Sequence, residues 1–147
     1  MSAAEQPDAE MIPPPPEGFV RSQGRGLFST VNGPYFHRRT EGGLAEQAFF
    51  ALPRHANSIG IVHGGMLSAF MDGLLASAAG QGTGKVSVTI HLSIDFLHMA
   101  RQGDWVLGEA KMTRATRDVA FAEGRAHIRG VDVVRASGIF KMMARHG

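Results

Sequence analysis

One acidic residue, Asp72, lies in the middle of an apolar stretch and is the residue best placed to do acid–base chemistry. Its neighbours include Phe70, Met71 and Leu74. Burying a carboxylate among such side chains is costly unless a partner compensates, and a carboxylate held there is suited to act as a general base. A structural carboxylate, bonded to neighbouring backbone in a packed interface, is the alternative. The pattern alone leaves both interpretations open.

The tripeptide His63-Gly64-Gly65 lies at the predicted start of the helix that carries Asp72. The first helical turn has N–H groups without internal partners and a partial positive charge. Glycine lets a ligand atom approach this backbone closely. Such a site can hydrogen-bond a carbonyl oxygen as its negative charge grows during a reaction. The alternative is a glycine-rich helix start with a surface histidine.

The spacing of Gly64 and Asp72 restricts how they can work together. A helix rises by about 1.5 Å per residue, so the two residues lie about 12 Å apart along one helix. Both cannot contact one reacting carbonyl group. If two copies pack these helices antiparallel across a two-fold axis, Asp72 of one copy approaches Gly64 of the other. The spacing therefore predicts a composite site in a homodimer.

Two further polar residues are candidates for this site. Asn57 precedes His63 in a loop, where its amide could orient a water or the partner's carboxylate, or simply make a local turn. Thr89 lies on the polar face of a predicted strand, where most threonines are structural.

The elements that must position these residues follow from periodicity. Residues 64–80 form an apolar, Ala- and Leu-rich stretch that predicts a buried helix, with Gly80, Gly82 and Gly84 ending it. Strict alternation predicts a strand over 86–97. A short helix near 22–31 and strands at 34–38, 44–52, 105–114, 119–129 and 133–143 complete the set, the last three joined as antiparallel hairpins.

This inventory predicts an α+β fold, a long antiparallel sheet curled around one helix. Such a sheet cannot cover the helix on every side, so an apolar face or edge must remain for a second copy of the chain. The pattern therefore predicts at least a homodimer, independently of the spacing of Gly64 and Asp72.

Composition narrows the class of protein. The chain has 147 residues, no cysteine and a net charge of +2, which suits one globular domain without disulfides or thiolate–metal sites. We expect no nucleic-acid partner, no membrane segment or signal peptide, no metal site and a cytoplasmic location. Residues 1–17, which end in four prolines, predict a flexible arm, or alternatively a proline-motif ligand.

The sequence resembles the hotdog-fold acyl-CoA thioesterases, in particular their phenylacetate-degradation-type branch. The segments NSIGIVHGGMLSAFMDGLLASAAG, VSVTIHLSIDFLHMA and QGDWVLGEAKMTRATRDVAFAEGRAHI carry the resemblance, which extends over roughly residues 33–145. It implies a hotdog domain over 18–147, with a long central helix wrapped by a five- to six-stranded antiparallel sheet. It also implies a homodimer that pairs into a dimer of dimers.

The resemblance also implies an activity, the hydrolysis of an acyl-CoA or aryl-CoA thioester to a carboxylic acid and CoA. Asp72 would be the general base or the nucleophile, and the Gly64 N–H would polarise the thioester carbonyl. His63 would support that loop, while Asn57 and Thr89 would hold the water or the carboxylate. CoA is part of the substrate, so no cofactor is implied. The chain departs from related sequences at His91 and at Met99-Ala100.

The predicted substrate-binding residues are Gly65, for close approach, and Arg101, Arg114 and Arg117, for the CoA phosphates. Ordinary solvated arginines are the alternative reading. Two other functions remain open for the chain, a hotdog hydratase or dehydratase acting on acyl thioesters, and a protein that binds acyl-CoA without turnover.

Overall fold

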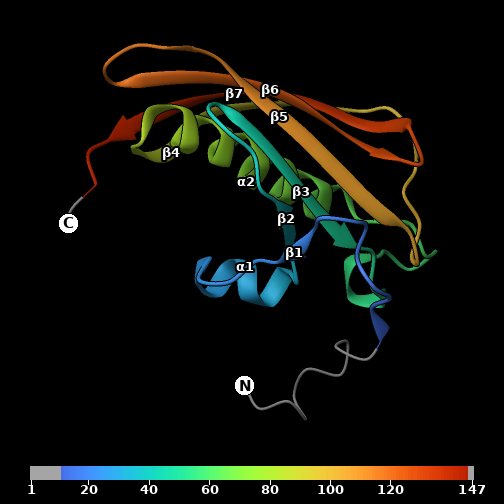
Figure 1. The fold of residues 1–147 in the computed structure, drawn as a ribbon. Helices are drawn as coiled ribbons and strands as arrows, with labels where there is room; N and C mark the ends of the chain where they lie inside the picture. Colours follow the sequence, from blue (N-terminus) through green and yellow to red (C-terminus); the bar gives the residue numbers. More distant parts are fainter. Residues whose placement is uncertain (1–10, 146–147) are drawn as a thin grey trace.

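A computed structural model describes residues 11–145 and shows one long helix against a seven-stranded antiparallel sheet (Figure 1). The strands lie in the order β1-β2-β3-β5-β6-β7-β4. The hotdog fold and the α+β class are confirmed, with seven strands where five to six were predicted. The elements are β1 (Val20–Arg21), α1 (Gly26–Asn32), β2 (Phe36–Arg38), β3 (Leu44–Phe50), the 3-10 turn η3 (Pro53–His55), α2 (Gly64–Thr83), β4 (Val86–Phe96), β5 (Trp105–Ala115), β6 (Val119–Ile128) and β7 (Val131–Met143).

Helix α2 is the predicted buried helix, but it runs one turn further than predicted. It ends at Thr83, and Gly84 adopts a left-handed φ of 71° and caps it. The prediction that Gly80 and Gly82 end the helix is wrong, because both lie inside it. A Cβ on Gly82 would lie 2.7 Å from Met112 Cε, so this glycine serves the close approach of α2 to β5.

The main core lies between α2 and the sheet. Gly108 of β5 makes this packing possible, since a Cβ there would lie 2.7 Å from Leu74 Cδ2 and 2.8 Å from Phe70 Cε2. Each large apolar side chain that is fully buried contributes about 1.5–3 kcal/mol to folding. The largest of these side chains are Phe49, Phe70, Phe140, Leu52, Met71, Leu74, Leu75, Val106, Val133 and Val134.

Strand β4 forms one end of the sheet and pairs only with β7. The strand predicted over 86–97 is present as Val86–Phe96, with one irregularity that its alternation does not indicate. The pairing register shifts between Thr89 and His91, so Ile90 is an extra residue in a β-bulge. Before the bulge Ser87 and Thr89 bond to α2, and after it Leu92 and Ile94 pack against the core.

A third layer lies on the side of α2 that faces away from the sheet. It contains α1 and the β1–β2 pair, which extend the sheet at its other end (Figure 1). The predicted arm lies partly outside the described residues. Within the described part, Ile12 packs against a second apolar cluster of Phe19, Phe36 and Ala48. Among residues 11–145, no helix has the length and apolarity that crossing a membrane requires.

Candidate active site

Asp72 and Thr89, two predicted site residues, form a direct hydrogen bond. Thr89 Oγ1 donates to Asp72 Oδ1 over 2.6 Å, which joins α2 to the edge strand β4. Asp72 is half-buried on the face of α2 that turns away from the sheet. Its partner is a side-chain hydroxyl and not the neighbouring backbone, so Oδ2 remains available to accept a proton from a substrate or a water.

His63 caps the N-terminus of α2. The Gly65 N–H donates to His63 Nδ1 over 2.8 Å, and the cap residue has an extended conformation with φ −61° and ψ 138°. Because Nδ1 accepts this bond, the ring proton lies on Nε2. A Cβ on Gly65 would lie 2.9 Å from His63 Nδ1, so the cap requires glycine at this position. The glycine predicted to admit a substrate thus has a local role in seating the imidazole.

The Gly64 N–H has no acceptor within residues 11–145. The next two N–H groups of the helix are occupied, that of Gly65 by His63 Nδ1 and that of Met66 by the His63 carbonyl. A Cβ on Gly64 would make only an ordinary 3.5 Å contact with Phe96. Packing within one chain therefore does not require glycine there, and the N–H is a free donor at the positive end of the helix dipole.

Asn57 orders the loop that leads to α2. Its Oδ1 accepts from the N–H groups of Ile59 and Ile61 over 3.0 and 3.1 Å, as in a local turn. The Nδ2 group has no partner in the described part of the chain. The side chain therefore has a structural role through its oxygen and one free donor, which is the group able to orient a water or a carboxylate.

One chain does not assemble these groups around a single point. Gly64 and Asp72 lie eight residues apart on α2, about 12 Å along its axis. The predicted phosphate-binding arginines are also separated. Arg101 forms an isolated β-bridge with Ile61, beside the N-terminal end of α2. The Arg117 carbonyl accepts a hydrogen bond from Lys85, just beyond the C-terminal end of α2. The two ends of this helix lie about 30 Å apart. Arg114 is the second-last residue of β5, near that same turn.

The free edge of the sheet lies beside this incomplete site. Val86, Val88, Ile90 and Phe96 of β4 are between 40% and 58% exposed. An exposed apolar edge strand is a surface for pairing with another chain.

Sequence reasoning missed a polar group beneath the other flank of α2. Gln47 is only 6% exposed, and its side chain donates to Ser77 Oγ over 2.8 Å and accepts from Arg25. A signal for it was present, because Gln47 alternates with Ala45 and Phe49 on a core-facing strand and so needs a buried partner. Arg25, in a glycine-rich segment, offered no such signal.

Within the described residues, no group of three or more His, Asp or Glu side chains could hold a metal ion. Asp72, Thr89 and the start of α2 supply a carboxylate, a hydroxyl and a free N–H group. Such groups can activate a water and stabilise an oxyanion.

Comparison with known proteins identifies the class. The model of the thioesterase superfamily matches residues 59–134, a stretch that includes α2, β4 and the site residues from His63 to Thr89. A Pseudomonas aeruginosa protein named "Putative esterase PA0474" is 33% identical over 129 residues, which are 86% of this chain and 96% of that protein. The chain belongs to the thioesterase superfamily, and thioester hydrolysis is its class of reaction.

Solved structures agree with this fold. The Escherichia coli PaaI protein from the phenylacetic acid degradation operon has a TM-score of 0.75 at 17% identity, over 82% of this chain and 86% of PaaI. A Streptococcus pneumoniae thioesterase protein solved with coenzyme A has a TM-score of 0.72 at 18% identity, over 77% of this chain and 88% of that one. The predicted resemblance to hotdog-fold thioesterases is therefore confirmed.

Proposed function

We propose that the protein hydrolyses acyl-CoA thioesters at a composite site made by two copies of the chain. The observation that carries the proposal is the pair of groups left uncommitted on α2, the Asp72 carboxylate and the Gly64 N–H. CoA enters as part of the substrate, in keeping with the coenzyme A bound by the Streptococcus pneumoniae relative.

The dimer supplies what one chain lacks. If β4 pairs antiparallel with β4 of a second copy, the sheet continues across a two-fold axis and the apolar edge is covered. The same axis sets the two α2 helices antiparallel, so Asp72 of each copy can approach Gly64 of the other. A further pairing of two such dimers stays a prediction from the family resemblance.

The chemistry follows from the two groups. The thioester carbonyl oxygen accepts from the Gly64 N–H, at the positive end of α2. Asp72 takes a proton from water, and the hydroxide adds to the carbonyl carbon to form a tetrahedral oxyanion, which that N–H stabilises. The oxyanion collapses, the C–S bond breaks, and the proton held by Asp72 goes to the CoA sulfur. Direct attack by Asp72 as nucleophile is the alternative route.

The neighbouring side chains position these reactants. Thr89 holds the Asp72 carboxylate in one orientation through the 2.6 Å bond. The free Nδ2 of Asn57 would orient the water or the carboxylate of the partner copy. His63 Nε2–H lies at the mouth of the site, where Arg101 is the nearest of the predicted phosphate-binding arginines, and Arg114 and Arg117 would come from the partner copy.

Release of free thiol from a panel of acyl- and aryl-CoAs tests the proposal. The Asp72→Asn variant is expected to lose at least about 100-fold in kcat, which corresponds to about 2.7 kcal/mol of barrier. Asp95→Asn is the matched control, because Asp95 lies on the same edge strand and has no ion pair within residues 11–145. Turnover by Asp72→Asn close to that of the control would refute the assignment.

A further inference from the structure

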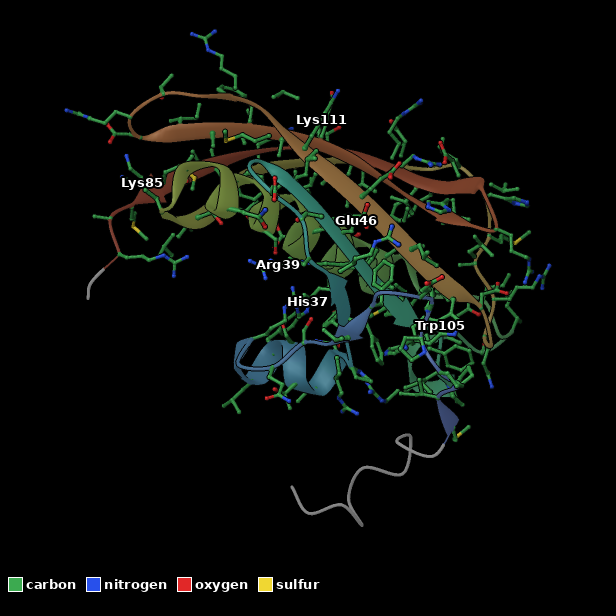
Figure 2. All side chains as sticks on the ribbon, viewed as in Figure 1. His37, Arg39, Glu46, Lys85, Trp105 and Lys111 are labelled. Carbon is green, nitrogen blue, oxygen red and sulfur yellow. The ribbon has the colours of Figure 1, made fainter. Side chains whose placement is uncertain are left out.

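A cleft of about 640 Å³ lies beneath the flank of α2 opposite to Thr89. Ser77 and Gln81 of α2 line one side of it, and residues of β1, β2 and β3 line the other. Its lining includes Arg25, Gln47 and Ser77, together with His37 and Arg39. Figure 2 shows His37 and Arg39 between α2 and α1. The one acidic side chain in this lining, Glu46, is already paired with Arg38.

Arg25 is the most unusual residue of this cleft. Its guanidinium stacks over the Tyr35 ring, 4.7 Å from the centroid. It also rests directly on the α2 backbone, because a Cβ on Gly73 would lie 2.8 Å from Arg25 Nη2. Burial lowers the pKa of Arg25 below its usual range, partly offset by the adjacent Tyr35. The cation therefore sits in a desolvated place that only a glycine on α2 allows.

No carboxylate within residues 11–145 lies at ion-pair distance from Arg25. Its one hydrogen bond is a long 3.4 Å contact from Nη1 to Gln47 Oε1. Gln47 in turn donates to Ser77 Oγ, and Ser77 donates to the Gly73 carbonyl over 2.8 Å. The network fixes Gln47 beside the guanidinium and leaves most of the Arg25 donors free. An uncompensated cation in such a place favours an anion as its partner.

The Arg25 guanidinium lies against the turn of α2 that carries the proposed catalytic carboxylate. Gly73 follows Asp72 directly, so the two positions differ by about 100° around α2. Ala69 and Ala76 lie between these two flanks on the outward face of the helix. Each carries only a methyl group, so no large side chain of α2 lies between the Asp72 side and the Arg25 side.

We infer that this cleft receives the far end of the acyl group, and that Arg25 selects thioesters whose acyl group ends in a carboxylate. The inference rests on the proposed function and adds the substrate class to it. The planar guanidinium can bind a carboxylate through two parallel hydrogen bonds. Arg39 adds positive charge to the same space, and His37 adds a hydrogen-bonding ring.

A matched pair of substrates tests the inference, adipoyl-CoA and hexanoyl-CoA, which share six acyl carbons and differ in the terminal carboxylate. We expect wild-type kcat/KM to favour adipoyl-CoA by at least tenfold. Arg25→Met should abolish this preference and leave hexanoyl-CoA hydrolysis at least as fast. Gly73→Ala should weaken the preference while keeping the charge, because the methyl group displaces the guanidinium. Arg21→Met, an exposed arginine of β1, is the control that should keep the wild-type ratio.

Three results would overturn the inference. The first is a ratio of kcat/KM for adipoyl-CoA to kcat/KM for hexanoyl-CoA that is the same in wild type and in Arg25→Met. The second is a loss of kcat/KM in Arg25→Met that is equal for both substrates and is absent when dephospho-CoA thioesters are used. That result would assign Arg25 to the 3′-phosphate of CoA. The third is a change of molar mass in Arg25→Met with an unchanged ratio, which would assign the guanidinium to a contact between copies.

Binding of the product separates this inference from the proposed function. Adipate should raise the melting temperature of the wild type more than hexanoate does, and Arg25→Met should remove the difference. If no thioester is hydrolysed but the adipate effect depends on Arg25, the hydrolase assignment fails and the anion site stands. If hexanoyl-CoA is hydrolysed and adipate has no effect, the site fails and the hydrolase assignment stands.

Discussion

Thr89 Oγ1 and Asp72 Oδ1 lie 2.6 Å apart, and their hydrogen bond ties the edge strand β4 to the outward face of α2. Both residues were predicted from the sequence as members of one site. The bond leaves the second carboxylate oxygen free and fixes the direction in which it points. In the proposed mechanism, that direction is towards the helix start of the partner copy.

Thr89→Val removes the hydroxyl at nearly constant volume. We expect kcat to fall by about tenfold, since a charge-assisted hydrogen bond contributes about 1.5–3 kcal/mol and Asp72 would lose its fixed orientation. KM should change little, because Thr89 does not contact the carbonyl in the proposed site. Steady-state kinetics check this, and Thr89→Ser should restore most of the loss. A Thr89→Val variant with wild-type kcat would show that the bond is structural.

Gly64→Pro removes the proposed oxyanion donor with little disturbance of the helix. Proline is favoured at the first helical position, and the extended conformation of His63 is compatible with a following proline. We expect kcat to fall by about 100-fold or more, as for other lost oxyanion donors.

Mixing Gly64→Pro with Asp72→Asn tests whether the site is shared between copies. Random exchange of subunits makes half of the dimers mixed, and each mixed dimer has one site with both native groups. The mixture should therefore recover about a quarter of wild-type activity. No recovery, with subunit exchange verified by mass, would place both groups of a working site in the same chain.

Gly65→Ala should separate stability from activity. The new methyl group would collide with His63 Nδ1 and displace the imidazole from its capping position. Loss of a cap costs about 1 kcal/mol, and replacing glycine by alanine in a helix returns a similar amount. We expect a melting temperature within a few degrees of wild type and a reduced kcat/KM. His63→Ala should give a similar kinetic loss, and full activity in Gly65→Ala would remove His63 from the site.

His55 should make the protein less stable in mild acid. Burial lowers the pKa of His55, whose Nδ1 accepts from the Leu52 N–H over 3.1 Å while Nε2 lies 2.6 Å from the Asn32 carbonyl oxygen. The unfolded chain therefore binds a proton at a higher pH than the folded chain does. Stability is complete above the unfolded pKa, near 6.5, and falls as pH decreases below it.

Urea unfolding between pH 5 and 8 checks this dependence. The free energy of unfolding should fall with decreasing pH in the wild type, and less steeply in His55→Gln. The exposed His91 provides the control, and His91→Gln should keep the wild-type slope. Equal slopes for wild type and His55→Gln would assign the acid sensitivity to other groups.

Most of the fold could be predicted because its strands and helix have strong periodicity. The run from Trp105 to Met143 alternates and turns at short intervals, which implies hairpins, and these are the pairs β5–β6 and β6–β7. The register of β4 could not be predicted, since the extra residue Ile90 is apolar and looks like any other member of the alternating pattern. Gly80 and Gly82 were assigned to the end of α2 because glycine is favoured both at a helix end and where a helix packs closely against a strand.

The candidate site could be predicted as residue types but not as contacts. The rise per residue of a helix was enough to show that Gly64 and Asp72 of one chain cannot contact the same carbonyl group. The bond between Asp72 and Thr89, and the loop bonds of Asn57, depend on how strand and helix pack, which spacing does not reveal. Arg25 was missed altogether because its contacts with Tyr35, Gln47 and Gly73 come from three distant parts of the chain.

The bulge at Ile90 lets Thr89 and Leu92, three residues apart in the sequence, face the same surface of β4, because they pair with Phe140 and Gly138, which lie two residues apart on β7. Removing Ile90 would leave Thr89 and Leu92 two residues apart, which is the spacing of two side chains on one surface of a regular strand. The Thr89 hydroxyl and the side chains of Leu92 and Ile94 would then keep their places in the site and the core. We therefore expect a chain that lacks Ile90 to keep both the bond between Asp72 and Thr89 and the packing of the core.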